Sequence, residues 1–111
     1  MKALRIKTNG DVKLLDFTNE TCYKTLSESV GGLIECVALA KDIDMWVNEE
    51  GKVAGLDLNP FATRLYRNAF GAVDLIAGDV VITGGVDDEG NTLGLSDESA
   101  DEILNYLVLT S

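Results

Sequence analysis

Residues 2–17 read KALRIKTNGDVKLLDF, and this stretch decides how the chain begins to fold. Leu4 and Ile6 alternate with charged residues, which is the period of a strand with one buried face. Asn9-Gly10 follows, and this pair favours the tight type I′ turn in which both residues adopt positive φ. The apolar pattern then resumes from Val12 to Phe17. The stretch therefore predicts an antiparallel β-hairpin.

The segment after the hairpin predicts a helix from Thr18 to Val30 that ends at Gly31-Gly32. Its candidate caps are Thr18, Asn19 and Thr21. Its expected apolar face consists of Cys22, Tyr23, Leu26 and Val30. Residues 33–40 are rich in strand formers and predict a largely buried strand. Residues 45–48 and 53–56, separated by a turn at 49–52, predict a second hairpin.

Asn59-Pro60 is the clearest helix start in the chain, because asparagine caps helices and proline suits the first helical position. The expected apolar face is Phe61, Ala62, Leu65, Tyr66 and Ala69, and Gly71 ends the helix. Residues 73–77 fit a short strand or a loop. Residues 80–83 predict a buried strand that ends at Gly84-Gly85, and residues 87–92 predict a loop.

Ser96 caps a final helix with an apolar stripe of Ala100, Ile103, Leu104, Leu107 and Val108. The stripe predicts that this helix belongs to the core, and that Leu104→Ala costs about 2–5 kcal/mol. The predicted order is ββα-βββ-α-β-α. We expect one α+β domain over residues 1–111, with about three helices on a mixed or antiparallel sheet.

Acidic charge is concentrated in the C-terminal part of the chain. The net charge is −10, and no Lys, Arg or His follows Arg67, whereas nine acidic residues do. Such a field repels nucleic acid and anionic membranes and attracts basic protein surfaces. We therefore expect no direct nucleic-acid binding and no membrane association, and we expect the nine acids to share one face. The candidate partner-binding face consists of Asp87, Asp88, Glu89, Asp97, Glu98, Asp101 and Glu102.

An ordered set of short motifs spans most of the chain. It starts with Val30-Gly31-Gly32-Leu33-Ile34-Glu35, includes residues 46–52, 55–56 and 59–63, and closes with residues 78–85. This set resembles the small proteins grouped as domain of unknown function 3846, over about residues 2–107. The resemblance implies a compact accessory protein encoded by a phage or another mobile element. It carries over no catalytic residues.

Three candidate sites each have a second interpretation. The acidic face either solubilises the protein or imitates nucleic-acid phosphates toward a basic partner. The helix start with Asn59, Thr63, Arg64 and Arg67 either holds the phosphate of a small nucleotide or is simply a well-capped helix. The loop at residues 87–92 lacks the EF-hand register, so a turn explains it better than a calcium site.

Two classes of function follow. The first is a non-catalytic protein that binds or inhibits a partner, with an anti-defence role that blocks a basic host protein or sequesters a nucleotide signal. The second is a small metal-dependent carboxylate hydrolase. The chain has no histidine, which excludes Ser-His and Cys-His catalysis, and no cofactor is expected. We expect a cytoplasmic protein with buried thiols at Cys22 and Cys36, and the oligomeric state stays open.

Overall fold

A five-stranded antiparallel sheet in the order β2-β1-β5-β4-β3 organises the computed structural model, which describes residues 1–71 and 74–110. The central strand β5 joins the N-terminal hairpin to the second strand pair. The α+β class, the antiparallel sheet and the three helices are confirmed for the described residues. The elements are β1 (Lys2–Ile6), β2 (Val12–Asp16), α1 (Cys22–Val30), β3 (Ile34–Ala40), β4 (Ile43–Asn48), α2 (Pro60–Phe70), β5 (Val80–Thr83) and α3 (Asp97–Leu109).

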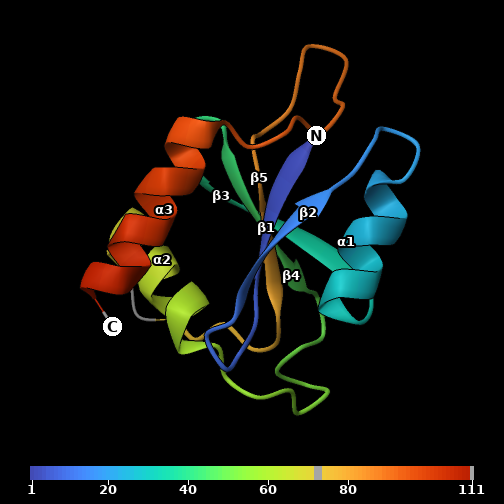
Figure 1. Cartoon of the computed structure of the whole chain (residues 1–111). Coiled ribbons are helices and arrows are strands. Elements are labelled where there is room, and N and C mark those ends of the chain that lie inside the picture. Colours follow the sequence, from blue (N-terminus) through green and yellow to red (C-terminus); the bar gives the residue numbers. More distant parts are fainter. Residues whose placement is uncertain (72–73, 111) are drawn as a thin grey trace.

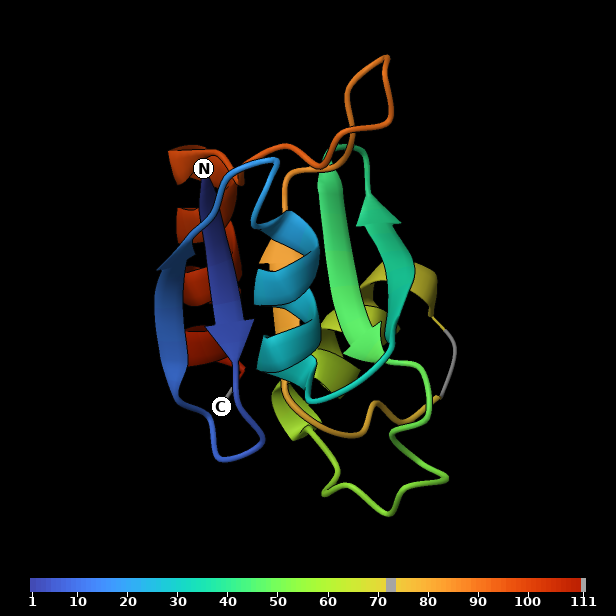
Figure 2. The ribbon, with the colours of Figure 1, turned by 90° about the vertical axis from the view of Figure 1, so that its right-hand side faces the viewer.

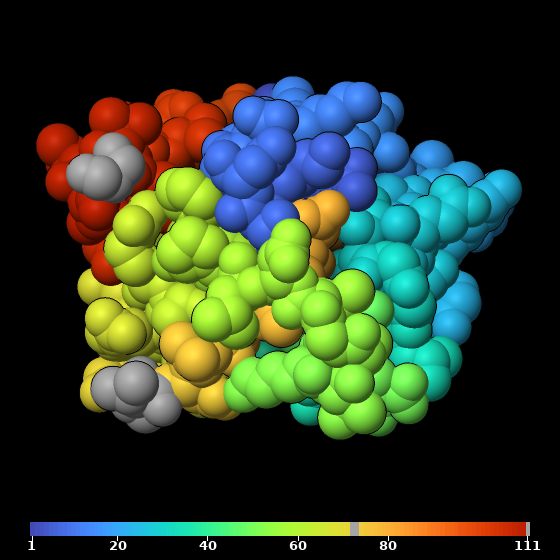
Figure 3. All heavy atoms as spheres, turned by 90° about the horizontal axis from the view of Figure 1, so that it is seen from below, coloured from blue at the N-terminus to red at the C-terminus, as the bar shows by residue number. Residues whose placement is uncertain are grey.

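The opening hairpin is confirmed, but its turn is not the expected type I′ turn: Gly10 has a positive φ and Asn9 does not, and residues 7–11 connect the two strands. β1 and β2 pair in continuous register from Lys2↔Asp16 to Ile6↔Val12. Gly10 has φ +93°, and the ring of Phe61 lies 2.7 Å from where a Cβ on Gly10 would stand. Only glycine fits both the backbone conformation and this contact. The turn therefore packs directly on the start of α2, and Figure 3 shows the blue hairpin turn against the yellow-green helix.

The second hairpin was predicted in the wrong place. β4 pairs with β3 around a tight turn at residues 41–42, and residues 51–55 form turns instead of a strand. The fold thus has one strand fewer than expected between α1 and α2. Asp42 adopts a positive φ of 60°, which aspartate tolerates better than most residues. Val53, the apolar residue that suggested a return strand, is 92% exposed.

The helix boundaries follow the capping residues. Asn59 accepts a hydrogen bond from the Ala62 amide, and Gly71 ends α2 in the left-handed conformation, both as expected. Ser96 caps α3 by accepting from the Ser99 amide. α1 ends at Gly31 as predicted but begins four residues later than Thr18, since the hydroxyl groups of Thr18 and Thr21 bond each other's backbone instead.

Helices cover both faces of the sheet. α2 and α3 lie on one face and α1 on the other (Figures 1 and 2). Trp46 packs at the α1 side, and its Nε1 donates to the Thr83 hydroxyl at 2.8 Å. The buried core on the α2–α3 side is Leu4, Ile6, Met45, Val47, Ala62, Leu65, Ile76, Val80, Ile82, Leu95, Ala100, Ile103 and Leu107. The core on the α1 side is Ala3, Phe17, Leu26, Val30 and Val81.

Several residues expected in the core are exposed. Tyr23 and Val108 are 62% and 72% exposed, and Ala69 and Cys36 also lie on the surface. For the three helical residues, the period alone extends an apolar face too far when a helix has a neighbour on only part of that face. Cys36 lies on β3, which was expected to be largely buried but is an edge strand without a buried residue. Leu104 is half-buried, which matters for the site below. Of the predicted segment 73–77, Val73 lies outside the described residues, and residues 74–76 form a loop that reaches a single bridge at Ala77.

Cys36 offers a test of local electrostatics. Both cysteines are free thiols. Burial of part of the side chain, with the Asp44 carboxylate nearby, raises the pKa of Cys36 from 9.0 to about 11. Only the thiolate is alkylated. In a Cys22→Ala background, the alkylation rate should therefore keep rising through about pH 10, and Asp44→Asn should shift the profile to lower pH. A plateau near pH 9 in the folded protein would contradict this account.

Candidate functional site

A groove runs between the edge strand β2 and helix α3. It consists of two adjoining hollows of about 530 and 210 Å³ that share Val12 and Leu104. The larger hollow is bounded at one end by Lys2, Asp97 and Asp101, and the smaller one closes against Phe61 and Val108. Figure 3 shows how α3 in red, the hairpin in blue and the start of α2 meet at this second end.

The groove has an apolar floor that solvent reaches. Leu14 is 57% exposed on β2, and Val12 and Leu104 are partly exposed beside it. They converge because β2 presents Val12 and Leu14 on the same face as α3, while α3 presents Leu104 one turn after Asp101. Apolar side chains that cluster on one surface mark an interaction site more often than scattered ones.

The outer edge of β2 adds backbone groups to this surface. Among the described residues no strand pairs with that edge, and the register with β1 is regular over five residue pairs. The opposite edge of the sheet, β3, differs because its pairing with β4 shifts register between Ala38 and Ala40. Bulges of this kind protect sheet edges from pairing with other chains. The β2 edge lacks that protection.

The charged end of the groove is acidic on balance. Lys2 forms an ion pair with Asp97, and this hydrogen bond, with the Asp97 and Asp101 charges, raises the pKa of Lys2 above its ordinary value. Asp101 is exposed, and no base other than Lys2 lines the groove. The described lining thus carries one positive and two negative charges. A cationic group on a partner is the natural counterpart for Asp101.

The acidic residues of the predicted partner-binding face fall into two groups. Asp97 and Asp101 on α3 line the groove, whereas Glu98 and Glu102 are exposed on the same helix and are not among the lining residues. Asp88 and Glu89 are exposed on the loop that projects at the same end of the molecule as the start of α3 (Figures 1 and 2).

Asp87, by contrast, has a structural role in that projecting loop. Its carboxylate accepts from the Glu89 and Asn91 amides, both at 2.9 Å, and these bonds lower its pKa. The carboxylate of Asp87 therefore stabilises the turn.

The expectation that all nine C-terminal acids share one face is wrong for Asp74 and Asp79. Both precede β5, whereas the projecting loop follows that strand, so they lie at its opposite end. Each is paired with a base from the first half of the chain: Asp74 with Lys52 at 2.5 Å and Asp79 with Arg5 at 3.2 Å. Long-range ion pairs of this kind cannot be inferred from charge counts along the sequence.

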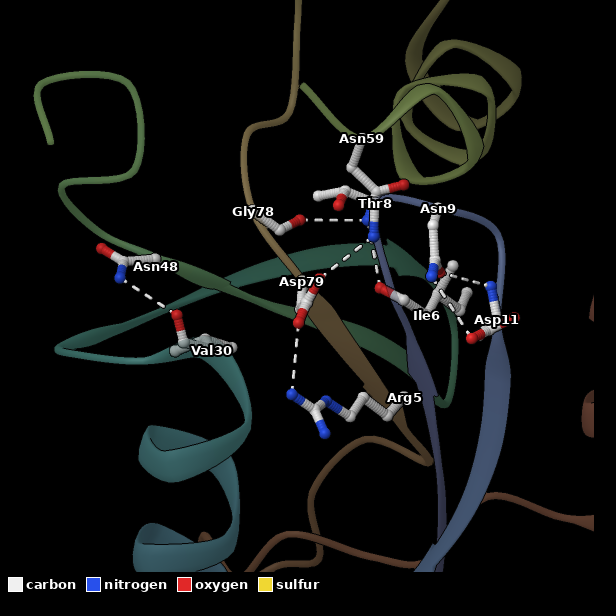
Figure 4. A network of polar contacts seen from close by, with 10 residues as sticks. All are labelled: Arg5, Ile6, Thr8, Asn9, Asp11, Val30, Asn48, Asn59, Gly78 and Asp79. Carbon is white, nitrogen blue, oxygen red and sulfur yellow. Dashed lines mark hydrogen bonds and ion pairs between the residues drawn. The ribbon is translucent and has the colours of Figure 1, made fainter. Parts of the chain in front are cut away.

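The predicted anion site at the start of α2 is built mainly from buried groups. Asn59 is fully buried and donates to the carbonyl groups of Ile6 and Gly78, each at 3.0 Å (Figure 4). Thr63 is buried and accepts from the Ile76 amide at 3.0 Å.

The two arginines of that predicted site do not join Asn59 and Thr63 around one hollow. The guanidinium of Arg64 lies 4.9 Å from the centre of the Phe61 ring, and Arg67 is exposed one turn further along α2. The structure thus shows Asn59 and Thr63 in bonds that hold the loop before β5.

Figure 4 also shows how Asp79 supports the hairpin that forms the groove. Its carboxylate accepts from the Thr8 amide at 3.0 Å and from Arg5 at 3.2 Å. Asn9, in the turn, accepts from the Asp11 amide at 3.0 Å. These bonds fix the end of β1 and the start of β2, so the exposed strand edge is presented by a well-bonded turn.

Sequence reasoning missed the residues that make the groove apolar. Val12 and Leu14 were assigned to a strand, but their exposure depends on which neighbour covers that strand, and no local pattern reports this. Phe61 was placed on the core face of α2, and it lies half-buried at the closed end of the groove. The available signal was Leu14-Leu15, two consecutive apolar residues in a short N-terminal strand.

Comparison with known proteins identifies the family. The chain matches the family described as Domain of unknown function (DUF3846) over residues 1–108, and it belongs to that family. No curated protein and no solved structure matches it. Across residues 1–71 and 74–110, no three or more Cys, Asp or Glu side chains are grouped so that they could hold a metal ion. No described helix has both the length and the apolar character needed to span a membrane.

Proposed function

We propose that this protein acts by binding a partner protein at the groove between β2 and α3. The occupant is a segment that carries apolar side chains next to Lys or Arg. Its apolar side chains cover Val12, Leu14 and Leu104, and its cationic group pairs with Asp101. The observation that supports this most is the combination of a solvent-accessible apolar floor with an acidic end beside an unpaired strand edge.

Charge favours a basic partner over a second copy of the chain. A symmetric dimer through β2 would bring the same patch of both copies together. The acidic residues of the two α3 helices would then approach each other, in molecules that each carry a net charge of −10. Like charges brought together oppose association, whereas opposite charges speed and orient it.

This activity fits a cytoplasmic accessory protein of a phage or mobile element. A small acidic protein that occupies the basic surface of a host protein would block that surface. An anti-defence role of this kind is part of the proposal and rests on the charge distribution and the groove. Sequestration of a nucleotide receives less support, because Asn59 and Thr63 are already bonded within the protein.

Peptide display on the purified protein tests the proposal. Selection from a random library should enrich peptides with apolar residues adjacent to Lys or Arg, since the floor and the acidic end select for these two features. Leu14→Glu should abolish the enrichment, because it places a charge on the floor. Tyr23→Glu is the matched control: Tyr23 is also an exposed apolar residue but lies on α1, on the other face of the sheet.

Sedimentation of the free protein completes this test. We expect a monomer at all concentrations. A dimer that dissociates in Leu14→Glu would show that a second copy occupies the groove and would overturn the proposal. Enriched peptides that bind Leu14→Glu as well as the wild type would overturn it too.

A further inference from the structure

A separate cavity of about 380 Å³ lies toward the opposite edge of the sheet, beside β3 and β4 and away from the groove residues. One wall is formed by strands β3 and β4. The second is the turn region that begins at Gly51 and Lys52, and the third is the segment Asp74–Ala77 that leads into β5. Its volume lies in the range of pockets that hold small molecules. It shares no lining residue with the groove between β2 and α3.

The interior of the cavity is apolar and partly aromatic. Val37 and Val47 come from neighbouring strands, Ile76 is buried beneath them, and Tyr66 enters from α2. The ring of Tyr66 is fixed by Phe70, with the two ring centres 4.8 Å apart. A flat or branched apolar group would therefore find both a side wall and an aromatic surface.

The rim of the cavity carries three carboxylates and one ammonium group. Glu35, Glu49 and Asp74 are exposed on this rim, and Lys52 is the only base among the lining residues. Lys52 bonds Asp74 at 2.5 Å, across the gap between the turn region and the segment before β5. This contact leaves Glu35 and Glu49 as net negative charge on the β3–β4 side.

The Lys52–Asp74 pair shows which chemistry the rim accepts. A primary ammonium group already binds a carboxylate there, and this hydrogen bond holds the pKa of Asp74 below its ordinary value. Glu35 on β3 and Glu49 just after β4 offer the same type of oxygen among the lining residues. An amine that entered the cavity would meet acceptors of the kind that Lys52 uses.

We propose that this cavity binds a small organic cation, namely a primary amine attached to an apolar or aromatic body. The body packs against Val37, Val47 and Tyr66, and the ammonium group bonds Glu35 and Glu49. A phosphate-bearing ligand such as a nucleotide is disfavoured, because Glu35 and Glu49 leave the rim with net negative charge once Lys52 is paired with Asp74.

Amide NMR titrations with phenethylamine and with its anionic counterpart, 3-phenylpropionate, test this inference. We expect phenethylamine to shift resonances of the cavity residues, and we expect the anion to leave them unchanged. The double variant Glu35→Gln, Glu49→Gln should weaken the amine about fivefold, since each exposed ion pair contributes modestly. The variant keeps the fold, because both side chains are exposed.

The double variant Glu98→Gln, Glu102→Gln is the matched control. It removes the same charge from α3 and should leave amine binding unchanged. Equal shifts with the anion, no shifts at cavity residues up to millimolar amine, or equal affinity in the Glu35→Gln, Glu49→Gln variant would each overturn the proposal. These outcomes concern the cavity alone and do not depend on peptide binding at the groove.

Discussion

Asn59→Ala is expected to lower the free energy of unfolding by about 3–5 kcal/mol, measured by urea denaturation. The Asn59 side chain is fully buried and makes three hydrogen bonds. Alanine would remove the cap of α2 and would leave the carbonyl groups of Ile6 and Gly78 buried without their donor. Buried polar groups that lose a partner carry most of the expected cost.

The matched control is Ser96→Ala at the start of α3. Ser96 also caps a helix, by accepting from the Ser99 amide at 3.1 Å, but it is exposed. Its loss should cost about 1 kcal/mol. If both substitutions cost the same, Asn59 acts only as a helix cap, and the link that it makes between β1, α2 and the start of β5 does not stabilise the fold.

Leu107→Ala is the second large effect, with an expected loss of about 2–4 kcal/mol. Leu107 is 6% exposed and packs in the core on the α2–α3 side. Leu104, three residues earlier, is half-buried, so Leu104→Ala should cost only about 1 kcal/mol and not the larger amount expected from the helical pattern. Denaturation midpoints of the two variants give the comparison. Equal losses would mean that Leu104 is as buried as Leu107.

Much of the fold follows from short-range patterns. The Asn9-Gly10 turn, the Asn59-Pro60 start of α2 and the Ser96 start of α3 all act through bonds between residues close in sequence. Such bonds leave local signatures, so the hairpin and both helix starts were predicted correctly, although Asn9 does not adopt the positive φ of the expected type I′ turn. The pairing of β4 with β3 was missed, because the turn at residues 41–42 contains no glycine and depends on Asp42 adopting a positive φ.

The candidate site was less accessible to sequence reasoning. The acidic residues of α3 were identified from composition, but the apolar half of the groove requires β2 and α3 to lie side by side. These elements are more than 80 residues apart in sequence. The ion pairs of Asp74 and Asp79 with Lys52 and Arg5 are likewise long-range. Contacts between distant segments depend on topology, which no local spacing reports.

The central claim is that an acidic, apolar groove selects a basic segment, and one measurement tests it directly. A peptide selected on the wild-type protein, and the same peptide with its Lys or Arg residues replaced by Glu, are compared by fluorescence anisotropy on wild-type protein and on Asp101→Lys. The account predicts a preference of about tenfold or more for the basic peptide on the wild type, and loss or reversal of that preference on Asp101→Lys. An unchanged preference on both proteins would contradict the claim that the groove beside α3 recognises the partner's charge.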